Sequence, residues 1–316
     1  TVPAKAKASD KLTTAPADLP RPGQLSLDVS GDFSLALDVA RDPCDPFGEG
    51  ELTVKSEEVA PEQEPRWQFS FRKKDGLRLW TGPEDTYTFY VATGADLVTW
   101  KDGVGSFDAE LVSDDGKKVT VKGAATCTHL PKAPVPDDVK AYVKARGKQA
   151  VRDYSTYDFG RAKHEGAISV VVDLADSRAL IAELRQGLPA QWAVYSGTSR
   201  WLGDEKHDGA VEVVVTPAAT QLDILRIARS DAVNYGKGTD SLIARLAKWD
   251  AKYGIDIFHA ETDTVELTLK KKPEDLAAFA QELYEFCPDI VDQGVGSVKA
   301  LEKQLETSLD VYLWWD

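Results

Sequence analysis

The sequence lacks any apolar run approaching the roughly 18–20 residues that a membrane-spanning helix requires, so we expect no membrane insertion. Basic residues are also in short supply, because 38 Lys and Arg face 52 Asp and Glu and leave a net charge of −14. This balance opposes binding to nucleic-acid phosphates and favours a basic partner. The 316 residues, 42% of them hydrophobic and 28% charged, are typical of a globular protein with room for two domains.

Only three cysteines occur, which is too few for a disulfide scaffold, and their spacing matches no zinc motif. We favour free buried thiols for Cys44 and Cys127, and their pairing in an oxidising compartment is the alternative. Cys127 and His129 offer two metal ligands without a second pair nearby. Phosphate-loop, G-x-S-x-G and H-E-x-x-H motifs are absent. We therefore predict no metal and no cofactor.

The segment DPCDPFGEGEL (42–52) carries a local acidic cluster, formed by Asp42, Asp45, Glu49 and Glu51. Carboxylates at this density suit either a solvated loop or a calcium site. We interpret the cluster as a solvated loop and keep calcium as the alternative.

Composition divides the chain into four parts. Residues 1–24 are rich in Ala, Pro, Lys and Asp and contain no apolar core of a signal peptide, so they predict a flexible leader. We expect either a chain that has lost its initiator methionine or an exported chain whose signal has been removed. Residues 25–130 alternate apolar and polar positions between turn signals, which predicts an all-β sandwich or small barrel. Residues 131–160 form a proline-rich linker with one helix, and 161–316 form a second domain.

The second domain mixes strands and helices. Strands are predicted for AISVVVDLA (167–175), WAVYSG (192–197), VEVVVT (211–216) and LDILRIAR (222–229), and helices for the periodic segments between and after them. Asp176 or Ser177 is expected to cap the first helix, and Ser297 the last. The order predicts an α+β sandwich with an antiparallel or mixed sheet and helices on one face. Two similar strand–helix segments suggest a ferredoxin-like tendency.

The stretch EFCPDIVDQGVGS (285–297) follows a predicted helix. Pro288 disfavours helical geometry at Cys287, so the helix should end there, and its negative dipole end raises a thiol pKa. Cys287 is therefore predicted to be a buried thiol rather than a nucleophile. Asp289, Asp292 and Gln293 could grip a basic partner, or they could cap the next helix and satisfy loop amides.

The chain then ends on YLWWD (312–316). In a strand, Trp314 and Trp315 must point to opposite faces, so one can enter the core. The other is covered by a neighbouring element in the structural interpretation that we favour, and serves a binding edge beside Asp316 in the alternative.

The last ninety or so residues resemble a bacterial family known as domain of unknown function 4253. The resemblance rests on LRIARSDAVNY (225–235), LIARLAKWDAKYGI (242–255) and the segment from DLAAFAQELYEFCPDIVDQGVGS to YLWWD. It implies a fold unit over roughly 165–316 and supplies no activity; residues 1–160 resemble no family. Together with the reasoning above, it predicts these binding residues: Asn234, Tyr235, Cys287, Asp289, Asp292, Gln293, Trp314, Trp315 and Asp316.

Three functions remain open. We favour a non-enzymatic protein whose acidic module recognises a protein partner, in the manner of an immunity protein or antitoxin that captures a basic effector. A hydrolase is the first alternative, with Asp289, Asp292, Asn234 or Tyr235 in a carboxylate pocket near 286–294. An exported protein that binds a surface polymer is the second. The first function suits the cytoplasm, whereas the last requires the periplasm or secretion.

Overall fold

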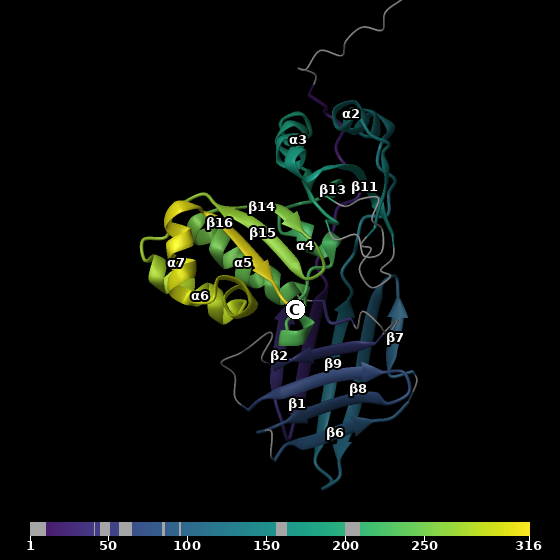
Figure 1. Cartoon of the computed structure of the whole chain (residues 1–316). Helices are drawn as coiled ribbons and strands as arrows, with labels where there is room; N and C mark the ends of the chain where they lie inside the picture. Colours follow the sequence, from purple (N-terminus) through teal and green to yellow (C-terminus); the bar gives the residue numbers. More distant parts are fainter. Residues whose placement is uncertain are drawn as a thin grey trace, which may run out of the picture. The chain divides into compact units, whose positions relative to one another are not determined.

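The computed structural model describes residues 11–40, 42–44, 51–56, 65–83, 86–94, 96–155, 163–199 and 209–316. The chain forms two compact units (Figure 1). Arg21–His129 make up the N-terminal unit, and Leu130–Asp316, joined by the described part of Thr1–Pro20, make up the C-terminal unit. Within the described residues, no helix combines the length and the apolar character needed to cross a bilayer.

The N-terminal unit is one curled antiparallel sheet, a half-barrel. Its nine strands are β1 (Gln24–Gly31), β2 (Leu35–Val39), β3 (Leu52–Lys55), β4 (Trp67–Arg72), β5 (Gly76–Thr81), β6 (Thr88–Ala92), β7 (Val98–Lys101), β8 (Val104–Ser113) and β9 (Lys118–Thr126). They follow the order β2-β1-β9-β8-β6-β5-β4-β3, with β7 on β8. Every second side chain of β1, β4 and β8 enters one core, as the alternation predicted. The prediction of an all-β unit is confirmed.

A disulfide joins Cys44 to Cys127, with 5.4 Å between their Cα atoms, so the free thiols favoured from the sequence are wrong. The sheet brings the two cysteines within bonding distance although 83 positions separate them in sequence. The disulfide links the segment after β2 to the end of β9, and Cys44 also bridges Leu52 of β3. Of the predicted acidic cluster, Asp42 accepts hydrogen bonds from the backbone of Cys44 at 3.0 Å and of Thr128 at 3.1 Å. Asp45 and Glu49 lie outside the described residues.

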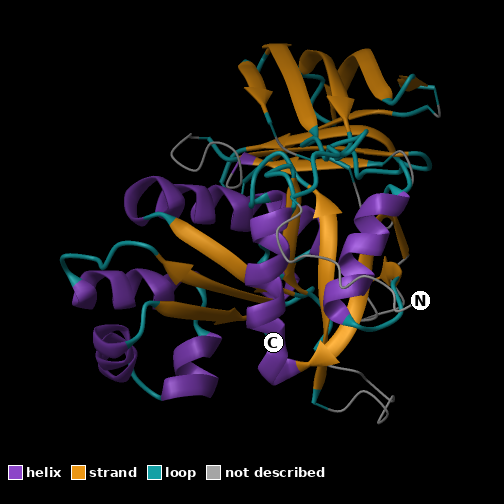
Figure 2. Ribbon diagram, turned by 90° about the horizontal axis from the view of Figure 1, so that it is seen from above, coloured by secondary structure: helices purple, strands orange, loops and turns teal. Residues whose placement is uncertain are grey.

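The C-terminal unit holds a seven-stranded mixed sheet and several helices, which are drawn in purple in Figure 2. Its elements are α2 (Asp137–Gly147), β10 (Arg152–Ser155), β11 (Lys163–Asp173), α3 (Leu174–Gly187), β12 (Trp192–Ser196), β13 (Ala210–Pro217), α4 (Asp223–Ala228), the short η3 (Val233–Tyr235), α5 (Thr239–Tyr253), β14 (Ile255–Ala260), β15 (Thr264–Leu269), α6 (Leu276–Phe286), η4 (Ile290–Val295), α7 (Val298–Thr307) and β16 (Asp310–Trp314). The strand order is β10-β11-β13-β12-β14-β15-β16, and β12 and β14 run parallel. The predicted α+β class is confirmed.

Helices lie on both faces of this sheet, whereas the sequence predicted one face. Helices α4 to α7 share a core with the inward side chains of β14, β15 and β16. Helices α2 and α3 share another core with β11, β12 and β13, on the opposite face. Neighbouring residues on β13 separate the two cores, since Val213 and Val215 enter the α3 core and Val214 the other.

The segment 222–229 is helix α4 rather than the predicted strand. Asp223 accepts hydrogen bonds from the backbone of Ala219 at 2.9 Å and Thr220 at 3.0 Å, which fixes the turn that leads into the helix. It also pairs with Arg226 one turn later at 2.7 Å. An apolar-rich run of eight residues is compatible with the two-residue period of a strand and with the 3.6-residue period of a helix. The local bonds of Asp223 favour the helix.

Two predicted helix starts have different outcomes. Ser297 caps α7, because its side chain accepts a hydrogen bond from the backbone of Ala300 at 3.1 Å. Helix α3 instead follows directly from β11, with Asp173 at its N-cap, so Asp176 and Ser177 lie inside the helix.

Candidate functional site

Within the described residues, helix α3 covers only part of the sheet face on which it lies. On β14, β15 and β16, the residues Ile257, Leu267 and Leu313 enter the core with α5 to α7. Their neighbours therefore point to the face that carries α3. We call this half-sheet the open face; it is formed by Asp256, Phe258, His259, Thr264, Glu266, Thr268, Asp310, Tyr312 and Trp314.

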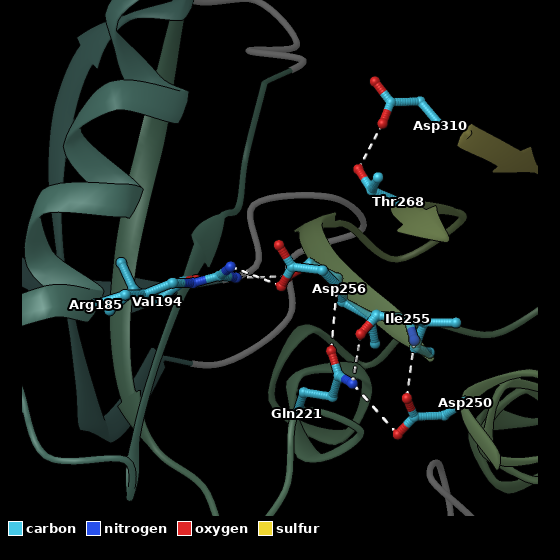
Figure 3. A network of polar contacts seen from close by, with 9 residues as sticks. Arg185, Val194, Gln221, Asp250, Ile255, Asp256, Thr268 and Asp310 are labelled. Atoms are coloured by element: carbon cyan, nitrogen blue, oxygen red, sulfur yellow. Dashed lines mark hydrogen bonds and ion pairs between the residues drawn. The ribbon is translucent and has the colours of Figure 1, made fainter. Parts of the chain in front are cut away.

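One end of the open face is neutralised by arginines of α3. Arg185 contacts Asp256 at 2.7 Å, as Figure 3 shows, and also donates to the backbone oxygens of Val194 and Ile257. It therefore ties β12 to β14. Arg178 pairs with Asp310 at 3.2 Å, and its guanidinium lies 3.4 Å from the centre of the Phe258 ring.

A second network fixes the beginning of β14 (Figure 3). Gln221 donates to the Ile255 carbonyl at 3.0 Å and accepts from the Ile257 backbone at 3.1 Å. Asp250 accepts from the Ile255 backbone at 2.8 Å. Because these bonds come from the turn before α4 and the end of α5, they hold β14 and its polar side chains in place.

The other end of the open face borders a cavity of about 350 Å³. Its lining consists of Ser199, His259, Glu261, Thr264, Glu266, Tyr312 and Trp314. The set combines two carboxylates, one imidazole, two small hydroxyl side chains and two large aromatic rings. Such a mixture of apolar surface and a few polar groups is typical of a binding pocket.

Glu261 is the buried anchor of this cavity. It is 4% exposed, and its Oε1 accepts hydrogen bonds from the backbone of Ser199 at 3.0 Å and from the Ser199 hydroxyl. His259, 6% exposed, places its Nε2 3.2 Å from the same oxygen. The serine hydroxyl binds the carboxylate rather than the imidazole, so these three residues do not form a serine-nucleophile triad.

Glu266 is the second carboxylate of the cavity, and it is only partly buried. Within the described part of the chain, its side chain makes no hydrogen bond or ion pair. It pairs across the strands with Tyr312, which is 46% exposed, while Thr264 lies opposite Trp314. Among the residues whose structure is described, no cation thus compensates this carboxylate, which lies beside aromatic side chains.

The predicted residues 287–293 form a different, largely internal arrangement. Asp289 is 4% exposed, and its carboxylate accepts from Tyr235 at 2.6 Å, Gln293 at 3.1 Å and the Asp316 backbone at 2.9 Å. Burial raises the pKa of Asp289, but these three donors outweigh it and leave the pKa below its usual value. In turn, Asp289 raises the pKa of Tyr235 to about 12. The structure therefore brings three predicted residues, Tyr235, Gln293 and Asp316, around the carboxylate of a fourth, Asp289.

The remaining predicted residues of this region lie outside that cluster. Asp292 is exposed and accepts from the Tyr284 hydroxyl at 3.2 Å. Asn234 is exposed on η3. The two aspartates thus bind different tyrosines and do not converge on one catalytic position.

Cys287 is fully buried at the end of α6. Its Sγ lies 3.0 Å from the carbonyl of Trp314 and 3.3 Å from the backbone nitrogen of the same residue, so the thiol satisfies backbone groups of β16. Burial raises the pKa of Cys287 to about 12. This arrangement is that of a structural thiol.

Trp314 and Trp315 point to opposite faces, as predicted from strand geometry. Trp315 is 3% exposed, packs edge-on against Phe286 and belongs to the core of α5 to α7. Trp314 is half-buried and lines the cavity of the open face. It also lines a second, more apolar space of about 260 Å³ beside Asp289, Gln293 and α7.

Sequence reasoning missed Ser199, His259, Glu261 and Glu266 as site residues. The available signal was alternation, since TVELTLK (264–270) and DVYLWW (310–315) place polar or aromatic residues at every second position. That pattern shows an uncovered face on each strand. It does not show that the strands are neighbours.

The fold and these sites define an α+β module attached to a β half-barrel. Residues 212–316 match the model of the domain of unknown function DUF4253, so the chain carries that domain in its C-terminal part. The match confirms the resemblance seen in the sequence and leaves the N-terminal region unassigned. No curated protein and no solved structure matches the chain.

The matched segment does not contain the whole sheet. Strand β12 (Trp192–Ser196) precedes residue 212, yet it lies between β13 and β14. Ser199, which holds Glu261, also precedes the match. In this chain, the sheet and the cavity of the DUF4253 domain therefore depend on β12 and Ser199, which precede the matched residues 212–316.

Proposed function

We propose that the chain is a non-enzymatic binding protein whose C-terminal unit recognises a basic protein partner on the open face. The observation that carries this proposal is the cavity at the end of that face, where Glu266 has no cationic partner among the described residues. Acidic residues at the other end already pair with Arg178 and Arg185. The unmatched negative charge thus lies beside the exposed Tyr312.

The charge of the whole chain supports the same proposal. A net charge of −14 attracts a basic partner over long range and accelerates its encounter. An immunity protein or antitoxin that neutralises a basic effector is the form of this function that we propose.

The residues around Asp289 support a binding role over hydrolysis. A general acid or base needs a pKa near the working pH and access to substrate. Asp289 has a lowered pKa and three donors, and Cys287 is buried with a raised pKa. Neither residue has the protonation behaviour that such catalysis requires.

The test is quantitative capture from a lysate of the native host at physiological salt. Tagged wild-type protein and the charge-reversed Glu266→Lys variant are compared, with Asp114→Lys as the control on an exposed turn of the N-terminal unit. We expect a basic protein to be retained by the wild type and the control and to be lost with Glu266→Lys. Equal retention by all three proteins, or no retained protein, would contradict the proposal.

A second candidate function is recognition of a surface polymer by the half-barrel of an exported protein. Two observations favour it. The Cys44–Cys127 disulfide is stable in oxidising compartments. On the side of β5 and β6 away from the core, Trp80 packs against Tyr87, which is 56% exposed, and Phe89 is 37% exposed. Aromatic rings of this kind offer flat contact surfaces to a ligand.

Thiol trapping in intact host cells tests the exported alternative. A disulfide retained at Cys44 and Cys127 before lysis, together with binding to host surface polysaccharide that Tyr87→Ala abolishes, would support it. Free thiols at both positions in the cell would exclude it.

A further inference from the structure

We propose that the cavity of the open face binds the guanidinium group of an arginine side chain from the partner. This inference rests on the proposed function and specifies its ligand. Glu266 supplies the opposing charge, Tyr312 and Trp314 supply aromatic walls, and Glu261 forms the buried end of the pocket.

The chain itself contains a parallel for this arrangement on the same face. Arg178 lies 3.4 Å from the centre of the Phe258 ring and pairs with Asp310. A guanidinium between an aromatic ring and a carboxylate gains both cation–π attraction and charge-assisted hydrogen bonds. The cavity has the same combination of ring and carboxylate, since Tyr312 of β16 lies opposite Glu266 of β15. It differs in one respect: no Arg or Lys side chain among the described residues pairs with Glu266.

The volume of the pocket and the fixed position of Glu261 also fit one side chain. Its volume of about 350 Å³ lies at the lower end of small-ligand pockets, which span roughly 300–1,000 Å³. Glu261 is fixed by Ser199 and lies beside His259, so the deep carboxylate is positioned before a ligand arrives. Fixed acceptors lose little conformational entropy on binding.

Guanidinium is favoured over ammonium for a physical reason. Its planar shape stacks on aromatic rings and its donors form a fixed fork, whereas an ammonium is a compact and strongly hydrated point charge. A pocket with aromatic walls and carboxylates at two depths uses both properties of guanidinium.

The experiment titrates the full chain with three neutral-backbone probes that differ in one group: Nα-acetyl-arginine methylamide, its citrulline analogue and its lysine analogue. Citrulline keeps the shape of arginine without its charge. Binding is followed by NMR shifts of the tryptophan indoles and by calorimetry. We expect arginine to bind at least about tenfold more tightly than citrulline and more tightly than lysine, with weaker binding at high salt.

Two variants locate the binding. Glu266→Gln preserves the shape of the side chain and should weaken arginine binding by about tenfold or more, since one charged hydrogen bond contributes about 1.5–3 kcal/mol. Tyr312→Leu should weaken it through loss of the ring. Glu306→Gln, an exposed position on α7, is the matched control and should bind as the wild type does. Unfolding curves verify that all variants are folded.

The outcomes separate this inference from the function on which it rests. Equal binding of arginine and citrulline, absence of arginine binding, or unchanged binding in Glu266→Gln would overturn the guanidinium site. If capture of the basic partner nevertheless depends on Glu266, the proposed function stands and only its ligand is wrong. If arginine binds and no partner is retained, the site stands and the partner function fails.

Discussion

Cys287 shows how strongly a local environment determines the chemistry of a residue. The helix end, the following proline and burial all disfavour the thiolate. The sequence predicted all three, and the structure confirms the burial, since Cys287 is 0% exposed. It adds that Sγ contacts backbone atoms of β16. A cysteine within a distinctive motif can therefore serve packing alone.

This environment predicts an unreactive thiol. With Cys44 and Cys127 joined, Cys287 is the one remaining cysteine, and its raised pKa of about 12 keeps it protonated at neutral pH. A thiol reagent at pH 8 should label no cysteine in the native protein and one after denaturation without reductant. Rapid native labelling of Cys287 would contradict this assignment.

Asp289 predicts a pH-dependent contribution to stability. Its pKa is lowered in the folded state, so its contribution is complete above the unfolded value of about 3.9 and is lost as the pH falls through the folded value. Asp289→Asn should reduce the free energy of unfolding by about 1–3 kcal/mol at pH 7, because it disturbs three part-buried hydrogen bonds.

The difference between wild type and Asp289→Asn should shrink as the pH is lowered toward 2. Denaturant unfolding at several pH values measures it. Asp292→Asn is the control, since Asp292 is exposed, and a loss of similar size there would refute the structural role given to Asp289.

At the scale of elements, strand β12 has the largest consequence. It pairs with β13 on one side and β14 on the other, and it supplies Val194 and Tyr195 to the two cores. Without β12, the backbone groups of both neighbours and their apolar faces would lose their partners. A sheet interrupted in this way cannot keep its buried polar groups satisfied.

The isolated segment 212–316 is therefore expected not to fold. It should show no cooperative unfolding transition and rapid amide exchange, whereas Leu130–Asp316, which contains β12, should unfold cooperatively. The longer fragment should be less stable than the full chain, since it loses the bonds of Leu12 to Gly187 and of Trp192 to Thr14. A stable, cooperative 212–316 fragment would show that β12 is dispensable.

At the scale of the whole molecule, the two units are stabilised differently. The C-terminal unit has large cores on both sides of its sheet. The N-terminal half-barrel has one core and a disulfide that closes a separation of 83 residues. A crosslink over so long a segment restricts the unfolded chain and stabilises a fold with a single core.

Removal of this crosslink should affect one unit. The double variant Cys44→Ala/Cys127→Ala is expected to lower the stability of the half-barrel by about 2–5 kcal/mol. Amide exchange should accelerate in β8 and β9 and remain unchanged in β14 and β15. Equal acceleration in both units would contradict an independent contribution of the disulfide.

Local patterns were sufficient for several features of this protein. Alternation predicted the strands of the half-barrel, and the Ser297 cap was correct. Short motifs within 225–235, 242–255, 275–297 and the terminal YLWWD indicated the DUF4253 domain. Each of these signals lies within a few residues of the chain, where sequence spacing determines geometry directly. Local signals failed at 222–229, where a short apolar run fits a strand and a helix equally well, and at the start of α3, where Asp173 rather than Asp176 or Ser177 is the N-cap.

The sequence by itself determined the classes of the two units, the DUF4253 domain at 212–316 and the position of Cys287 at the end of a helix. Only the tertiary structure decided that β12 lies between β13 and β14, that α3 covers half of its face, and that Cys44 meets Cys127. The candidate cavity belongs to this second group. Ser199, Glu266 and Tyr312 are far apart in sequence and become neighbours through strand order, which depends on long-range packing that no local pattern records.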